Sequence, residues 1–340
     1  MDAGSPRRLA SARAATLLLG AALAVGSCGG AASPTPSPGP TGTPEPAACV
    51  AAPAPPADLE GWTIAPAEPT VFPVIVNSGG SLTCGPSRLL FTFLDGENLP
   101  VGRPDRSASV ALFNLGRDGA TPTQTVNGTF AWGIENERGF YVAAVTFPEA
   151  GEWGAEFATA VNDAAAEKIR VRFEVKASSP VVQVGEPAPT TDTPTAASVG
   201  GDLARISTDT DPDPAFYETS VKDAIAAHEP FVLVFATPKF CASAQCGPTL
   251  DRVKSIAAAY PDVTFINVEP YVLEFRDGSL QPVLDTSIDP PTLTPAGPTV
   301  AWGLLSEPWV FVVDGAGFVT GSFEGVIADS ELRAAIDAVR

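Results

Sequence analysis

The chain has 340 residues, of which 45% are hydrophobic and 17% charged, and it is rich in Pro (35) and Gly (31). This length predicts more than one domain, and so much Pro and Gly excludes an all-helical protein. The net charge of −19 excludes nucleic acid as a natural partner, while a single His and a single Met leave few groups for a metalloenzyme or a Ser-His-Asp hydrolase. Cysteine, carboxylate and backbone groups remain, which directs attention to the five cysteines.

The N-terminus has the pattern of an export signal. A positive start that includes Arg7 and Arg8 precedes a largely apolar run over 14–25, which is too short to span a bilayer as a stable helix. The run ends in Val-Gly-Ser and Cys28, which resembles the bacterial lipobox, whose Cys is lipidated after cleavage. We expect a signal peptide over 1–27 and an extracytoplasmic protein anchored in the cell membrane as a lipoprotein. An unlipidated signal peptide and a plain membrane anchor are the alternatives.

Two Pro-rich segments divide the rest of the chain. Residues 31–56 are mainly Pro, Thr, Ser, Gly and Ala, and such a segment buries too little apolar surface to fold, which predicts a disordered tether. Residues 177–201 have a similar composition and mark a domain boundary. The predicted organisation is a signal peptide (1–27), the lipidated Cys with its tether (28–60), a first domain (61–176), a linker (177–201) and a second domain (202–340).

Short strand-like runs fill the first domain. Residues 168–175 alternate strictly between charged and apolar side chains, as in a strand with one face in a core and one in water. Turn signals such as Asp95-Gly96 and Asp118-Gly119 separate the runs, and no helix intervenes. This pattern predicts an all-β immunoglobulin-like sandwich. The expected strands are 88–94, 108–115, 124–134, 140–147, 152–161 and 168–175.

A short resemblance supports this fold. Residues 141–157, with Phe147-Pro-Glu-Ala-Gly-Glu-Trp153, resemble the closing hairpin of the FixH/YtkA-like and CopC-like periplasmic sandwiches. Some of those folds bind copper through His or Met. Residues 61–176 contain neither residue type, so a structural or partner-binding role is expected.

Cys49 and Cys84 belong to this half of the chain. An even pair in an oxidising compartment is normally joined, so we expect a structural disulfide that fixes the end of the tether to the first domain. Two free thiols are the alternative.

The second domain changes to alternating helix and strand patterns. Ser220 opens a Ser-x-x-Asp capping signal, and the continuous apolar runs are typical of strands buried on both faces. The expected helices are 220–228, 249–260 and 329–339, and the expected strands are 231–235, 263–268 and a hairpin over 309–323. This order predicts an α/β fold of the thioredoxin type, with a central mixed sheet and helices on both faces.

Two cysteines directly follow the first of these strands. Cys241 and Cys246 lie in Phe-Ala-Thr-Pro-Lys-Phe-Cys-Ala-Ser-Ala-Gln-Cys-Gly-Pro, and Glu307-Pro308-Trp309 opens the hairpin. With these motifs, residues 207–340 resemble a subgroup of bacterial extracytoplasmic thioredoxin-like domains. The resemblance implies that the two cysteines are a redox pair at a helix N-terminus and that Pro308 is the cis-proline facing them.

The sequence departs from thioredoxins at two points. Four residues separate the cysteines, and five helical positions rise by about 7.5 Å, beyond the roughly 7 Å Cα limit for a disulfide. Cys241 is therefore expected in the loop before the helix, with Ser243 as a candidate N-cap. Val234 occupies the position of the buried carboxylate that accepts a proton in thioredoxins, so water, Asp251 or an unidentified group must replace it.

The favoured hypothesis is a thiol–disulfide oxidoreductase that acts on exported protein thiols or a membrane redox partner, without cofactor or metal. Cys241 is expected to attack, with Lys239 and the helix dipole lowering its pKa, Cys246 to resolve the mixed disulfide and Pro308 to seat the partner chain. Two alternatives stay open. One is a copper-delivery protein of Sco-like type, although no His follows Cys246. The other is a non-catalytic binding module with a structural disulfide. We expect a monomer.

Other conspicuous residues are interpreted as structural. His228 is expected on the surface at a helix end, and Trp302 and Trp309 in the core. The acidic run Asp209, Asp211 and Asp213 is interleaved with prolines and lacks the glycine and distal Glu of an EF-hand, so a solvated loop is expected.

Overall fold

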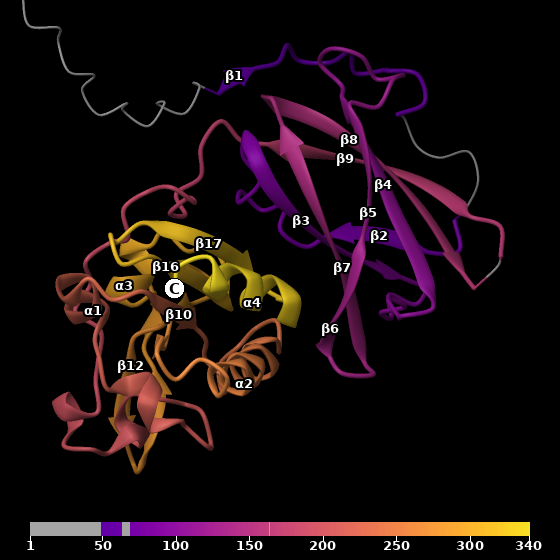
Figure 1. Ribbon diagram of the computed structural model, residues 1–340. Coiled ribbons are helices and arrows are strands. Elements are labelled where there is room, and N and C mark those ends of the chain that lie inside the picture. The colour runs from indigo at the N-terminus through magenta and orange to yellow at the C-terminus, as the bar shows by residue number, and fades with distance from the viewer. Residues whose placement is uncertain (1–48, 63–68, 163) are drawn as a thin grey trace, which may run out of the picture. The chain divides into compact units, whose positions relative to one another are not determined.

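The computed structural model describes residues 49–62, 69–162 and 164–340, and most of its regular structure is β-strand (Figure 1). Residues 48–340 form one compact unit. The predicted signal peptide, the predicted lipidation site Cys28 and most of the predicted tether lie outside the described residues. None of the helices in the described ranges has both the length and the hydropathy that crossing a bilayer requires.

Residues 49–175 contain strands and no helix within the described ranges. The strands are β1 (Val50–Ala51), β2 (Phe72–Ile75), β3 (Gly85–Leu94), β4 (Arg106–Asn114), β5 (Gln124–Asn127), β6 (Thr129–Ile134), β7 (Arg138–Phe147), β8 (Glu149–Val161) and β9 (Glu167–Val175). One sheet has the order β2-β3-β7-β6, and the other has the order β1-β8-β4-β5 with β9 also paired to β8. This β-rich part confirms the strand predictions to within a few residues.

The two sheets share one apolar core. Phe91 and Tyr141 enter it from one sheet, and Trp153 and Phe157 from the other. The predicted run 124–134 divides into β5, which pairs with β4, and β6, which pairs with β7. Gly128 stands at this crossing because a Cβ there would lie 2.9 Å from the Phe91 ring and 3.0 Å from Tyr141 Cβ.

The end of the tether is ordered. Cys49 and Cys84 form a disulfide with their Cα atoms 5.7 Å apart. The adjoining strand β1 pairs in parallel with β8, and the Ala52 amide donates to the Ala150 carbonyl at 2.8 Å. The expectation of disorder as far as residue 56 is therefore wrong for its last part, because composition does not show a disulfide and a neighbouring strand that hold the segment in place.

Removal of this disulfide is expected to destabilise the protein substantially. The bond closes a loop of 35 residues, for which the chain-entropy model gives about 4 kcal/mol. The double variant Cys49→Ala/Cys84→Ala is expected to lose roughly this free energy of unfolding, measured by urea denaturation without reductant. An unchanged denaturation midpoint would show that the bond contributes nothing to stability.

The C-terminal part alternates helices and strands. It begins with three short 3-10 helices: η1 (Ala197–Val199), η2 (Leu203–Arg205) and η3 (Pro214–Tyr217). The α-helices are α1 (Val221–Ala227), α2 (Cys246–Ala257), α3 (Gly297–Ala301) and α4 (Asp329–Asp337). The strands are β10 (Phe231–Phe235), β11 (Thr264–Val268), β12 (Leu273–Arg276), β13 (Ser279–Pro282), β14 (Leu284–Asp285), β15 (Thr292–Leu293), β16 (Trp309–Val313) and β17 (Val319–Glu324). The main sheet has the order β11-β10-β16-β17, in which β10 runs parallel to β11 and antiparallel to β16.

Helices cover both faces of this sheet (Figure 1). All five side chains of β10 are buried, as its continuous apolar run predicts. Val232 and Val234 belong to the core that contains residues of α2 and α4. Phe231, Leu233 and Phe235 belong to the opposite core, which contains residues of α1 and Trp302. Trp302 and Trp309 are both buried, as expected. His228 is exposed and caps the C-terminus of α1, which agrees with the surface position expected for it at a helix end.

The segment predicted as a linker packs onto this sheet. Val181 and Val182 are buried in the core that contains Trp302. Gly185 and Glu186 exchange backbone hydrogen bonds with Val319, and the Ala188 amide donates to Gly317. The 177–201 segment is therefore not a free linker, because its few apolar residues find partners. The sequence also did not predict α3 or the strands β12 to β15, since Pro and Gly obscure their periodicity.

Candidate redox site

The two cysteines of the predicted redox pair form a disulfide at the start of a helix. Their Cα atoms are 6.0 Å apart. Cys241 lies in the loop after β10, and Cys246 is the first residue of α2, so the loop position expected for Cys241 is observed. Cys246 is fully buried, whereas Cys241 is partly exposed. A partner molecule can therefore reach only Cys241.

Ser243 has a different role from the expected helix cap. The residue at the N-cap position of α2 is Gln245, whose side chain makes no capping hydrogen bond. The Ser243 hydroxyl donates instead to the Glu307 carbonyl at 3.2 Å and lies 3.3 Å from Cys241 Sγ. It therefore joins the cysteine loop to the segment before β16.

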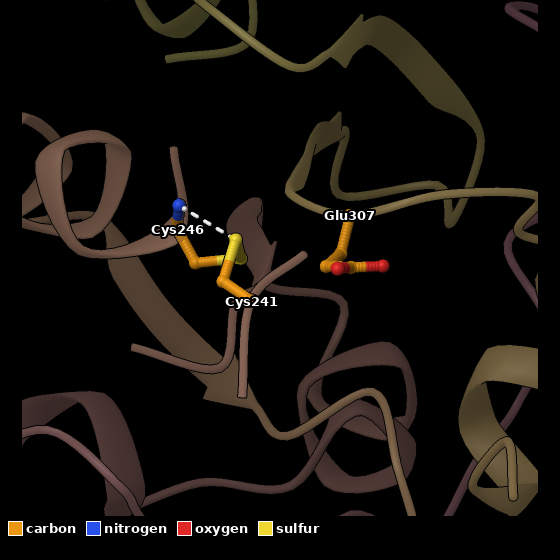
Figure 2. A group of neighbouring side chains, drawn as sticks. All are labelled: Cys241, Cys246 and Glu307. Carbon is orange, nitrogen blue, oxygen red and sulfur yellow. Dashed lines mark hydrogen bonds between the residues drawn. A yellow bond between two sulfur atoms is a disulfide. The ribbon is translucent and has the colours of Figure 1, made fainter. Parts of the chain in front are cut away.

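The helix N-terminus provides the positive potential beside Cys241. The Cys246 amide donates to Cys241 Sγ at 3.2 Å, as drawn in Figure 2. A thiolate at Cys241 would accept the same hydrogen bond and face the positive end of the α2 dipole. Lys239 was expected to contribute, but its ammonium donates to the Leu280 carbonyl at 3.2 Å and lies over the Phe240 ring. The structure therefore shows a backbone amide of the α2 N-terminus bonded to Cys241 Sγ, whereas the Lys239 ammonium is bonded elsewhere.

A carboxylate lies beside the cysteines. The Glu307 carboxylate oxygen and the two sulfur atoms all lie within 4.8 Å of one another, and Figure 2 shows the three side chains. The Ala242 amide donates to Glu307 Oε1 at 3.0 Å, and the Tyr271 hydroxyl donates to Oε2. Burial, together with this hydrogen bond and the Glu307 charge, raises the pKa of Tyr271. In the sequence, Glu307 stands out only as part of the motif Glu307-Pro308-Trp309.

Pro308 directly follows Glu307, and the peptide bond between them is cis. The Pro308 carbonyl accepts a hydrogen bond from the Gly325 amide at 2.8 Å, which attaches it to the end of β17. Asp251, one of the groups considered for proton transfer, has an exposed side chain that pairs with Lys254 at 2.9 Å.

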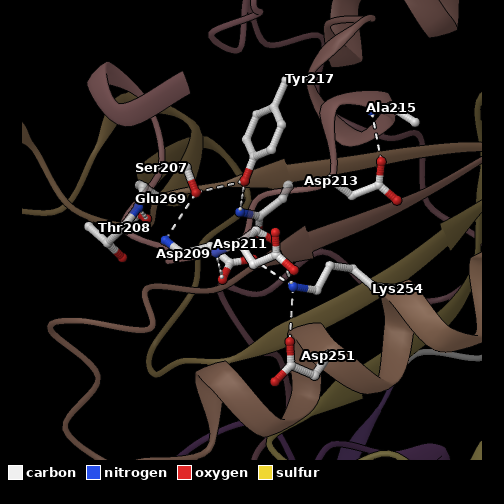
Figure 3. A network of polar contacts seen from close by, with 11 residues as sticks. Ser207, Thr208, Asp209, Asp211, Asp213, Ala215, Tyr217, Asp251, Lys254 and Glu269 are labelled. Carbon is white, nitrogen blue, oxygen red and sulfur yellow. Dashed lines mark hydrogen bonds and ion pairs between the residues drawn. The ribbon is translucent and has the colours of Figure 1, made fainter. Parts of the chain in front are cut away.

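A second carboxylate is buried behind the loop that leads to Cys241. Glu269 follows β11, is 8% exposed and accepts a hydrogen bond from the Thr208 amide at 2.6 Å (Figure 3). Its Oε2 has no hydrogen-bond partner among the described residues. Burial raises the pKa of Glu269 to about 7, although hydrogen bonds from Thr237 and Thr208 partly offset this effect. No sequence signal singled out this residue, because a lone Glu after a strand is usually exposed.

The acidic run before η3 stabilises the same region (Figure 3). Asp209 pairs with Lys254 at 2.7 Å, and Asp213 caps η3 by accepting from the Ala215 amide at 3.0 Å. The Lys254 ammonium also donates to the Asp211 carbonyl at 3.1 Å. The expectation of a solvated loop is therefore wrong for Asp209, because its side chain is only 10% exposed in the pair with Lys254.

No family model, curated protein or solved structure matches this chain. Function is therefore inferred from the residues of the site.

Proposed function

We propose that the protein is a membrane-anchored, extracytoplasmic thiol–disulfide oxidoreductase of exported proteins. The observation that carries the proposal is the position of the Cys241–Cys246 disulfide, with a partly exposed sulfur in a loop and a buried sulfur on the first residue of α2. A partly exposed sulfur beside a helix N-terminus is suited to attack, and a buried neighbour is suited to resolve the mixed disulfide.

We further infer that residues 202–340 have a thioredoxin-like fold and residues 61–176 an immunoglobulin-like sandwich. The mixed sheet β11-β10-β16-β17, with helices on both faces, supports the first inference. The two sheets around one core support the second. The sandwich contains no cysteine pair beyond its structural disulfide, so we assign the redox chemistry to the C-terminal part.

In the reductive direction, the Cys241 thiolate attacks one sulfur of a partner disulfide, and the partner's other sulfur leaves as a thiolate. The Cys246 sulfur then attacks Cys241 Sγ, which releases the partner as a dithiol and re-forms the Cys241–Cys246 bond. Cys246 must lose its proton for this step. The Glu307 carboxylate, within 4.8 Å of both sulfurs, is the acceptor we assign in place of the acid that Val234 replaces.

The chemistry of the partner is constrained by charge. Residues 200–340 contain 20 Asp and Glu against 8 Lys and Arg. A strongly acidic partner would be repelled, so exported proteins of neutral or basic surface are the expected substrates. We assign Pro308, beside the cysteine loop, the role of seating the extended chain of the substrate.

The decisive experiment is equilibration of the purified protein with glutathione. The Cys241–Cys246 pair is expected to interconvert at a potential above roughly −300 mV, within reach of an extracytoplasmic partner. Mass spectrometry after alkylation measures the fraction reduced, and the Cys49→Ala/Cys84→Ala variant ensures that only this pair is counted. If the Cys241–Cys246 pair is reduced only at potentials below roughly −300 mV, the disulfide is structural and the protein is a binding module.

The membrane anchor is tested separately. Cys28→Ala is expected to release the protein from the membrane fraction, because a lipobox cysteine is the site of lipid attachment. Immunoblots of fractionated cells give the measurement. Equal membrane association of the variant and the parent protein would contradict the lipoprotein assignment and leave the redox proposal intact.

A further inference from the structure

We propose that the reduced protein binds one zinc ion through Cys241, Cys246 and Glu307. This inference requires only that the disulfide be reducible, and it does not depend on exchange with a protein partner. It rests on the closeness of three ligand atoms, on the hydrogen bonds that fix the carboxylate and on the chemistry of the donor set.

The three ligand atoms lie close enough together for movements of 1 to 2 Å, on the order of one bond length, to bring them to coordination distances. All pairwise separations among the two sulfurs and the carboxylate oxygen are within 4.8 Å. Tetrahedral zinc with ordinary bond lengths places sulfur pairs about 3.8 Å apart and sulfur–oxygen pairs about 3.5 Å apart. Once the sulfur–sulfur bond of about 2.05 Å is broken, the sulfurs must separate by roughly 1.7 Å, and the Glu307 oxygen must approach them by roughly 1 Å.

Glu307 is held in place by groups that leave part of its carboxylate free. The Ala242 amide donates to Oε1 at 3.0 Å, and the Tyr271 hydroxyl donates to Oε2. A carboxylate has about four lone-pair sites, so two remain for a metal. Hydrogen bonds of this kind orient metal ligands and increase their affinity for the ion. The Ser243 hydroxyl, bonded to the Glu307 carbonyl, keeps the two ligand-bearing segments together.

The donor set distinguishes between metals. Two thiolates and one carboxylate are a mixed soft and hard set, which suits Zn²⁺ with water in the fourth position. Cu(I) prefers sulfur ligands and would gain little from Glu307, whereas Mg²⁺ and Ca²⁺ prefer oxygen ligands alone. Binding releases the two thiol protons to solvent. Glutathione disulfide, which takes up two electrons and is reduced to two glutathione thiolates, re-forms the Cys241–Cys246 bond, so both sulfur ligands are lost and the ion is released.

The test uses the full-length protein, reduced and kept free of oxygen, with zinc added in competition with a chromophoric chelator. We expect one zinc per chain, no binding by the oxidised protein, and loss of binding in Cys241→Ser and Cys246→Ser. Glu307→Gln is expected to weaken zinc affinity at least tenfold and to leave Cu(I) affinity nearly unchanged. Glu274→Gln, at an exposed acid paired with Arg276 on β12, is the matched control and is expected to bind zinc normally.

The proposal would be overturned by no zinc binding by the reduced protein at micromolar concentrations, or by equal zinc affinity in Glu307→Gln and the parent. A pair that no strong reductant opens would also overturn it. If Glu307→Gln does not fold, Co²⁺ added to the parent protein replaces the comparison. Its spectrum is expected to show tetrahedral coordination with two thiolates and one oxygen ligand from the protein. Failure to bind zinc leaves the glutathione equilibrium of the pair untouched, whereas a pair that cannot be reduced overturns both proposals.

Discussion

Cys246→Ser is expected to accumulate a covalent complex with a disulfide-containing partner, whereas Cys241→Ser is expected to form none. The partly exposed Cys241 sulfur makes the attack, and without the Cys246 thiol nothing resolves the mixed disulfide. Only Cys246→Ser is expected to form any covalent complex, because the fully buried sulfur that remains in Cys241→Ser cannot reach a partner. Non-reducing gel electrophoresis of the two variants, after incubation with an oxidised model protein, measures it.

A partner-free measurement provides the control. The reduced parent protein, treated with limiting alkylating reagent, is expected to be labelled first at Cys241, because the α2 N-terminus favours its thiolate. Preferential labelling of Cys246, or trapping by Cys241→Ser, would reverse the two roles. The Cys49→Ala/Cys84→Ala background removes the other disulfide of the described residues from the experiment.

Glu269→Gln is expected to stabilise the protein at pH 8 far more than at pH 5. Burial raises the pKa of Glu269 from 4.5 to about 7. A raised carboxyl pKa means that the folded state holds its proton more tightly than the unfolded chain. The contribution of the protonated Glu269 carboxyl to the free energy of unfolding is complete below about pH 4.5 and is lost as the pH rises through 7. The shift of the pKa corresponds to roughly 3 kcal/mol over the whole range.

Urea denaturation at both pH values checks this prediction. The glutamine retains an oxygen to accept from the Thr208 amide, so the substitution removes the charge with little change in the contact. Asp209 is the charged neighbour that further raises the pKa of Glu269, and it is itself paired with Lys254. The exposed Glu274→Gln serves as the control. An equal effect of Glu269→Gln at both pH values would show that the buried carboxyl does not titrate in this range.

The strands and helices that face a core were predictable because their periodicity is strong. The alternation of residues 168–175 predicted β9, and the continuous apolar run 231–235 predicted β10. Cys241 and Cys246 were identified from their place after β10. The tether end was predicted to be disordered and the 177–201 segment to be a linker, because their order depends on the Cys49–Cys84 bond and on backbone pairing with distant strands.

The carboxylates near the site were not predictable in the same way. Glu307 lies more than 60 residues from Cys241 in the sequence, and only the position of the segment before β16 brings it to the sulfurs. Glu269 looks like an ordinary acid at the end of a strand, and its burial depends on packing with the loop around Thr208. Lys239 was close to Cys241 in sequence, yet its side chain extends toward Leu280. Proximity along the chain was therefore a poor guide to electrostatics.

The packed segment around Glu186 also affects how the protein avoids self-association. β17 and β11 are the two outer strands of the C-terminal sheet, and an outer strand with free amides and carbonyls invites pairing with another chain. Gly185 and Glu186 are bonded to the backbone of Val319 at the start of β17, and the Ala188 amide donates to Gly317 just before this strand. The bonded start of β17 therefore leaves less of this outer strand open to edge-to-edge pairing with another copy of the chain.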